Sequence, residues 1–115
     1  MKKFGKILTI SLCLIALFST IAMGVTTPSG GNWNYGQEWD DMYEMAYSYY
    51  YHGSLDHGSY AAVDGESADG WDFKAAGLTS VSNSETLYYP YHVIVQCTDD
   101  EISPSVYEHD WYNTK

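Results

Sequence analysis

The chain has 115 residues and a formal charge of −10 at pH 7, from 15 Asp and Glu against 5 Lys and Arg. This length suits one small domain. The charge excludes a nucleic-acid-binding protein, because phosphate contacts need Lys or Arg, and it argues against docking on an anionic lipid surface by charge alone. The aromatic fraction of 17% excludes a disordered acidic tail, which is poor in aromatic residues.

The first 24 residues have the pattern of a secretory signal peptide. Three lysines lie in the first six residues, and an apolar run follows over residues 7–21. Ala22 and Gly24 supply the small side chains that signal peptidase requires three residues before and just before a cut. The apolar run is short for a bilayer span, which needs about 20 residues. We therefore predict a cleaved signal peptide at residues 1–24 and a secreted, extracellular protein without a stable membrane span.

Cleavage after Gly24 leaves Cys97 as the single cysteine of the mature chain, so no intramolecular disulfide can form. Three states of Cys97 remain open: a buried small hydrophobic residue, a reactive thiol, or one half of an intermolecular bond. The buried state is favoured, and a homodimer remains a possible assembly.

The next segments alternate between β-prone runs and turn signals. Residues 25–30 read as a flexible leader, and the first ordered stretch begins near Trp33. A helical face can be drawn through Trp39, Met42, Tyr43 and Ala46, but the four tyrosines within residues 47–51 favour a strand. Two glycines, a serine and an aspartate in residues 52–58 predict a hairpin loop. The returning strand is expected over residues 59–63.

The rest of the chain repeats this alternation. Three later segments are predicted to contain strands: one around the small residues 75–77, residues 86–96, and residues 106–112. Short strands with turns at this spacing predict an all-β fold, a small antiparallel β-sandwich or a small barrel. We place the sandwich domain at residues 31–96 and regard residues 97–115 as an acidic C-terminal extension.

No catalytic motif is present, and we expect a binding protein rather than an enzyme, without cofactor or metal. Pairing Cys97 with a distant histidine as nucleophile and base has no support from spacing. His52, Asp56 and His57 could form a two-histidine, one-carboxylate metal site. The acidic loop of residues 64–69 is the best candidate for Ca²⁺. Histidines bonded to backbone and solvated carboxylates are the favoured interpretation of both patterns.

The tyrosine surplus is the strongest sign of binding. Twelve tyrosines are more than the core of so small a domain can hold. Tyrosine combines a flat apolar face with a hydroxyl group, which suits sugar stacking and wet interfaces. A cell-wall glycan or another envelope ligand is the predicted partner. The alternative is that tyrosines line a small core where a larger one would use Leu and Phe.

Two motifs resemble the lactococcin 972 family of secreted bacteriocins. The first comprises Gly31, Trp33, Tyr35 and Gly36. The second, which leads to a strand ending at Val63, comprises Tyr47, Ser48, Tyr50, His52, Ser54, His57 and Ser59. An acidic Gly-containing loop, the Ala76-Gly77 step and the Tyr88-Tyr89 pair follow, so that the resemblance covers residues 31–91.

The resemblance implies a two-sheet antiparallel sandwich exported by the general secretory pathway. It also implies a bacteriocin that binds the cell-wall precursor lipid II and blocks septum formation without making pores, together with dedicated immunity and transport proteins. The alternative function is a secreted wall- or glycan-binding accessory module without killing activity. The candidate ligand-binding residues are Trp33, Tyr35, Tyr50, His52, Ser54 and His57. Trp33 and Tyr35 can equally belong to the core, and residues 52–57 are the expected recognition loop.

Overall fold

The computed structural model describes residues 19–99 and 106–113. Within them the chain forms nine strands and no helix, and therefore no helix that could span a membrane. The strands are β2 (Ser19–Thr26), β3 (Asn32–Asp40), β4 (Tyr43–Tyr51), β5 (His57–Val63), β6 (Asp72–Lys74), β7 (Thr79–Asn83), β8 (Leu87–Tyr88), β9 (His92–Thr98) and β10 (Val106–Tyr112). Most of the predicted signal peptide, residues 1–18, lies outside the described residues.

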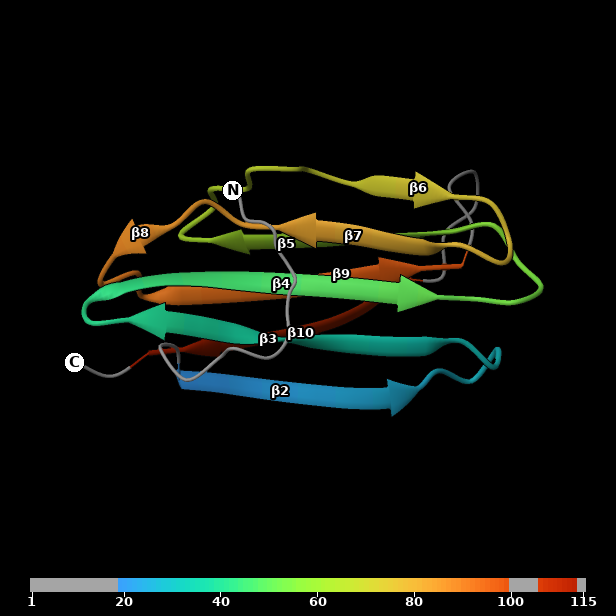
Figure 1. The fold of residues 1–115 in the computed structure, drawn as a ribbon, viewed down its shortest axis with the longest axis horizontal. Coiled ribbons are helices and arrows are strands. Elements are labelled where there is room, and N and C mark those ends of the chain that lie inside the picture. The colour runs from blue at the N-terminus through green and yellow to red at the C-terminus, as the bar shows by residue number, and fades with distance from the viewer. Residues whose placement is uncertain (1–18, 100–105, 114–115) are drawn as a thin grey trace.

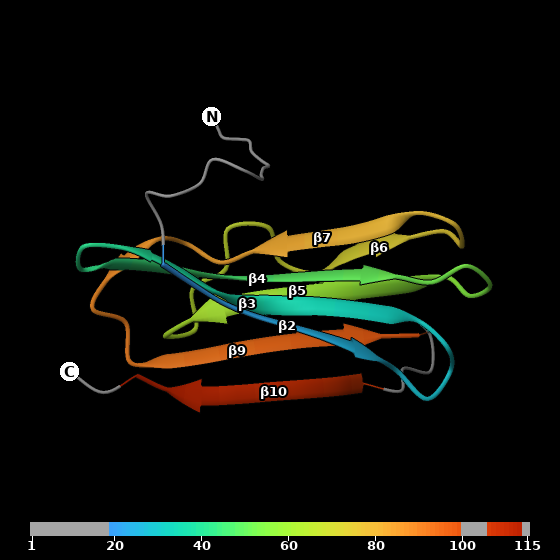
Figure 2. The same ribbon diagram turned by 60° about the horizontal axis from the view of Figure 1, so that its bottom comes forward.

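The strands form two sheets that face each other (Figure 1). One sheet has the order β2-β3-β4-β7, with β8 also paired to β4, and the other has the order β10-β9-β5-β6. Every pairing between these strands is antiparallel. Figure 2 shows β9 and β10 side by side along one edge of the molecule. The predicted all-β fold of two antiparallel sheets is confirmed.

The core lies between the sheets and follows the two-residue period of the strands. In β4, Ala46, Ser48 and Tyr50 are fully buried, whereas Tyr51 is 40% exposed. Alternate residues of a strand point to opposite faces, so this pattern directs one side of β4 toward the second sheet. The buried cluster consists of Trp33, Tyr35, Ala46, Tyr50, Ala61, Val63, Val93, Val95 and Cys97. The favoured buried state of Cys97 is confirmed.

The connection between β4 and β5 differs from the predicted hairpin. β4 pairs with β3, β7 and β8, whereas β5 pairs with β6 and β9 in the other sheet. Residues 52–56 therefore cross from one sheet to the other. Glycine, serine and aspartate favour a tight change of direction in either case, so loop composition does not distinguish a hairpin from a sheet-to-sheet connection.

The small residues 75–77 form a turn rather than a strand. β6 ends at Lys74 and β7 begins at Thr79, and the Leu78 amide donates to the Ala75 carbonyl at 3.2 Å. Gly77 has a φ of 90°, a conformation that glycine adopts without steric cost. The helical alternative near residue 42 is also absent, because the chain reverses at Asp41 and Met42 between β3 and β4.

The expected boundary after residue 96 falls inside β9. β10 pairs with β9 over seven residues, and its Tyr107 and Trp111 pack against the core. Residues 106–112 are thus a strand of the sheet and not an appendage. The acidic side chains of this segment point away from the core and alternate with the residues that pack on it. The acidic composition of the segment does not reveal this alternation. At the other end, β2 contains the predicted cleavage position after Gly24.

Candidate functional site

Five of the six predicted ligand-binding residues lie in the interior. They are between 0% and 3% exposed: Trp33, Tyr35, Tyr50, His52 and His57. Ser54 is exposed in the loop of residues 52–56. The structure brings Tyr50, His52 and His57 together and places Trp33 and Tyr35 in a second group. A ligand-binding role for these residues remains a prediction, and the structure assigns each buried residue a set of internal partners.

Tyr50 is the centre of the first group. Its ring makes edge contacts with His57 at 5.5 Å and with His52 at 6.2 Å between ring centroids. Its hydroxyl lies 2.8 Å from the Thr27 hydroxyl and donates to the Asp99 carboxylate. Burial, and then the hydrogen bond to Asp99, raise the pKa of Tyr50 above its ordinary value.

Asp99 connects this tyrosine to the end of the sheet. Its second carboxylate oxygen accepts a hydrogen bond from Tyr107 at 3.1 Å. Thr27, Asp99 and Tyr107 come from three separate segments of the chain, so no local motif identified them. The alternation of β4 directs Tyr50 inward, but the sequence holds no sign of which group its hydroxyl meets.

The two histidines hold loops in place. His52 accepts hydrogen bonds at Nδ1 from the backbone amides of Ser54 and Leu55, each at 3.1 Å. Since Nδ1 accepts, the proton of the neutral ring lies on Nε2, which is 3.1 Å from the Ser29 hydroxyl. His52 thus fixes the start of its own loop and ties it to the turn before β3.

His57 joins two loops through its two ring nitrogens. Nδ1 lies 2.8 Å from the Leu55 carbonyl oxygen, and Nε2 lies 2.7 Å from that of Leu78. A carbonyl oxygen only accepts, so each hydrogen bond needs a proton on the ring nitrogen that faces it. The loop of residues 52–56 is thereby clamped to the turn that leads into β7.

The expected metal patterns are not assembled in this structure. No group of three or more His, Cys, Asp or Glu side chains within residues 19–99 and 106–113 could hold a metal ion. The carboxylates bind backbone amides instead: Asp56 accepts from Ala76, and Asp64 accepts from Tyr91 and His92. These carboxylates act as caps on turns, which accounts for their position beside glycines.

The second group packs the other part of the core. Trp33 and Tyr35 lie 4.5 Å apart between ring centroids, and the Tyr35 ring stacks on His109 of β10 at 4.8 Å. The Trp33 indole donates to the Ser48 hydroxyl at 2.9 Å, which in turn donates to the Gln96 carbonyl across the sheets. Trp33 and Tyr35 thus serve as core residues that align the two sheets.

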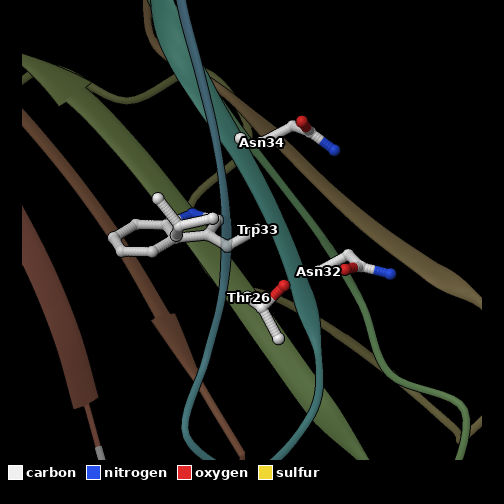
Figure 3. Close-up of a pocket in the computed structure, with 6 residues that line it drawn as sticks. Thr26, Asn32, Trp33 and Asn34 are labelled. Carbon is white, nitrogen blue, oxygen red and sulfur yellow. The ribbon is translucent and has the colours of Figure 1, made fainter.

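A shallow hollow lies beside Trp33, between β2 and β3 (Figure 3). Its lining consists of Gly24, Val25, Thr26, Asn32, Trp33 and Asn34. In Figure 3 the side chains of Asn32 and Asn34 project away from the Trp33 ring. The predicted cut after Gly24 would remove part of this lining, so the hollow is not a feature on which the mature protein can depend.

The surface, in contrast, carries many aromatic side chains. Eight are at least 36% exposed: Tyr43, Tyr51, Trp71, Phe73, Tyr88, Tyr89, Tyr91 and Tyr112. They include neighbouring pairs and triplets rather than scattered rings. Trp71, just before β6, and Phe73 within it are two residues apart and have stacked rings, and this spacing is the signal that sequence reasoning missed.

These features define a small all-β protein with buried polar clusters that hold its loops and aromatic side chains that reach its surface. The family model described as Bacteriocin (Lactococcin_972) matches residues 29–89, just over half of the chain. The chain belongs to this bacteriocin family, and the predicted resemblance is confirmed. Comparisons with curated proteins and with solved structures give no match. The family match ends before β9, although β5, which lies inside the match, pairs with β9 as well as with β6.

Proposed function

We propose that this protein is a secreted bacteriocin that binds a component of the target cell envelope and inhibits wall or septum synthesis without forming pores. Membership of the bacteriocin family supports the antibacterial part of this proposal. The observation that carries the binding part is the pair of parallel, exposed rings of Trp71 and Phe73 on a rigid two-sheet scaffold. Aromatic residues provide large contact area at low cost in conformational entropy.

The charge of the protein limits how it can engage the precursor lipid II. Lys74 is the one lysine or arginine among residues 19–99 and 106–113, and it pairs with Asp72 at 2.7 Å. An anionic pyrophosphate therefore meets no free cationic side chain in this part of the protein. Lipid II is one candidate envelope component, which would bind through its uncharged part or with a divalent cation that bridges pyrophosphate and carboxylates.

The test uses the mature protein purified from culture supernatant. We expect it to stop growth of sensitive bacteria and to block incorporation of labelled wall precursor before any loss of membrane potential. A fall in membrane potential that precedes the block would overturn the mode of action. Binding to isolated walls without inhibition of any strain in a panel of related bacteria would favour the accessory-module alternative.

A further inference from the structure

We propose that the outer face of the sheet β10-β9-β5-β6 binds an uncharged glycan chain. The contact centres on three aromatic residues, Tyr60, Trp71 and Phe73, which we call the aromatic row. The proposal deepens the proposed function, on which it rests for the presence of such a glycan in the envelope.

The aromatic row lies on one face because of strand register. Ser59 and Ala61 of β5 are buried toward the core, so Gly58 and Tyr60 face outward. Phe73 of β6 pairs with Gly58, which places it on the same outer face. Trp71 lies two residues before Phe73, and its ring stacks on that of Tyr60. Three residues from two chain segments thus form one surface.

The three rings run nearly parallel and stay open to solvent. Trp71 and Phe73 have ring centroids 5.6 Å apart with planes 12° apart, and Tyr60 and Trp71 lie 5.5 Å apart with planes 25° apart. Trp71 is 36% exposed and Phe73 is 40% exposed. A pyranose ring has flat faces of C–H groups, and aromatic rings exposed in this way can bind such a face.

Gly58 shapes the row. A Cβ atom at this position would lie 2.5 Å from Cδ1 of Phe73. The Phe73 ring therefore lies across the backbone of β5, over the one residue type that leaves room for it. The same Cβ atom would lie 3.1 Å from the Asp72 carbonyl oxygen, so an added methyl group would displace the exposed ring and also press on the backbone of β6.

Hydrogen-bonding groups continue the face beside the row. Gln96 of β9 is the register partner of Tyr60, and Glu108 of β10 is that of Gln96. The Gln96 amide donates to the Glu108 carboxylate at 2.5 Å. An amide and a carboxylate next to aromatic rings offer both donors and acceptors to sugar hydroxyls.

A second aromatic cluster lies at the far end of this face. Tyr112 stacks on His92 at 4.6 Å and contacts Tyr91 at 5.0 Å between ring centroids. His92 is four residues from Gln96 along β9, about 13 Å at a rise of about 3.3 Å per residue. Two aromatic clusters with polar residues between them suit a chain of several sugars better than a single one.

Charge selects against anionic ligands on this face. Glu108 and Asp110 of β10 are exposed on this face, whereas Lys74 follows Phe73 directly in β6, so that it points to the opposite side of the sheet, where it pairs with Asp72. The described part of this face therefore offers no free Lys or Arg for a phosphate polymer or an anionic lipid. An uncharged glycan is the envelope component that satisfies both the rings and the charge.

The experiment measures binding of chitohexaose and cellohexaose to the mature protein by calorimetry and tryptophan fluorescence. We expect one of them to bind and Trp71→Ala to weaken that binding about tenfold or more. Gly58→Ala should also weaken it, because the added methyl group displaces the Phe73 ring, and its melting temperature is measured in parallel to separate this effect from strain on β6. Tyr88→Ala removes an exposed ring from the other sheet and is the matched control, which should keep the wild-type affinity.

The proposal is overturned if the wild-type protein binds neither hexasaccharide, if Trp71→Ala binds as tightly as Tyr88→Ala, or if polyglycerol phosphate binds more tightly than both. Growth inhibition, assayed in parallel, separates the two claims. Inhibition without hexasaccharide binding leaves the bacteriocin function standing and removes the glycan face. Hexasaccharide binding without growth inhibition leaves the glycan face standing and removes the bacteriocin function.

Discussion

Tyr50 illustrates what a single residue reveals in sequence and what it does not. Residues 49–51 are three adjacent tyrosines that residue type alone cannot distinguish. In the structure, however, Tyr50 is fully buried and Tyr51 is 40% exposed. The two-residue period of a strand separates them once the strand is assumed. The partner of the Tyr50 hydroxyl, Asp99, lies 49 residues further along the chain, where only the folded structure brings it close.

Replacing Tyr50 by Phe tests the structural role of this hydroxyl. The variant removes the hydrogen bonds from the Tyr50 hydroxyl to Thr27 and to the Asp99 carboxylate, which costs about 1–3 kcal/mol of unfolding free energy although both partners keep other hydrogen bonds. Urea unfolding followed by circular dichroism measures it. Tyr51→Phe, at the exposed neighbour, should shift the free energy by less than about 0.5 kcal/mol. Equal stability of both variants would remove Tyr50 as an anchor.

The buried tyrosines also predict loss of stability at alkaline pH. Burial raises the pKa of Tyr47 to about 12, and it raises the pKa of Tyr49 and Tyr50 as well, from the ordinary tyrosine value of 10.0. The folded state therefore keeps these protons to higher pH than the unfolded state does. Their contribution to stability is complete below pH 10 and is lost as the pH rises toward the folded-state pKa values.

Unfolding free energies between pH 8 and pH 11.5 check this dependence. We expect a plateau followed by a fall above about pH 10, and a shallower fall in Tyr50→Phe, which lacks one of the titrating groups. A plateau that persists to the highest pH, or a slope identical in the variant, would contradict it.

At the scale of elements, strands were more predictable than their sheet partners. The strands near residues 43–51, 59–63, 92–96 and 106–112 follow from β-prone residues between turn signals. The transfer of β5 to the opposite sheet does not follow, because a loop of Gly, Ser and Asp serves either connection. The interior position of His52 and His57 was missed for the same reason. In a hairpin they would flank a solvent-exposed tip, whereas the crossing buries them between loops.

β10 gives the sharpest prediction at this scale. Removing residues 100–115 takes away the strand that pairs with β9, the two rings that pack on the core, and the Tyr107 partner of Asp99. We expect the truncated protein to lose its cooperative thermal transition, as judged by circular dichroism. A control that lacks only residues 114–115 should melt like the full mature chain. A melting temperature within a few degrees of that control would make β10 dispensable.

At the scale of the whole molecule, charge and aromatic surface act in opposite directions. The net charge of −10 repels anionic wall polymers and anionic lipids, whereas the exposed rings favour contact with uncharged groups. A bacteriocin that works by charge attraction to anionic membranes needs a net positive charge instead. Under the proposed function, attachment to the envelope therefore comes from short-range contacts that overcome a long-range repulsion.

This balance predicts an unusual dependence on salt. Salt screens charge, with a Debye length that falls from about 10 Å at 0.1 M to about 3 Å at 1 M. Proteins that bind by cationic residues lose affinity as salt is added, because their attraction is screened. For this chain screening weakens a repulsion instead, and burial of aromatic rings is not diminished by it. Affinity for isolated cell walls should therefore stay constant or rise between 0.05 and 0.5 M sodium chloride.

Sedimentation of the mature protein with purified walls measures this dependence. Walls stripped of their anionic polymers are the matched control, since without the repulsion binding should be tighter at low salt and nearly independent of salt. Anionic phospholipid vesicles should neither retain the protein nor release an enclosed dye at any of these concentrations. A steep loss of wall binding with added salt would show that attachment rests on charge, through a bound cation, and would shift the search from aromatic rings to carboxylates.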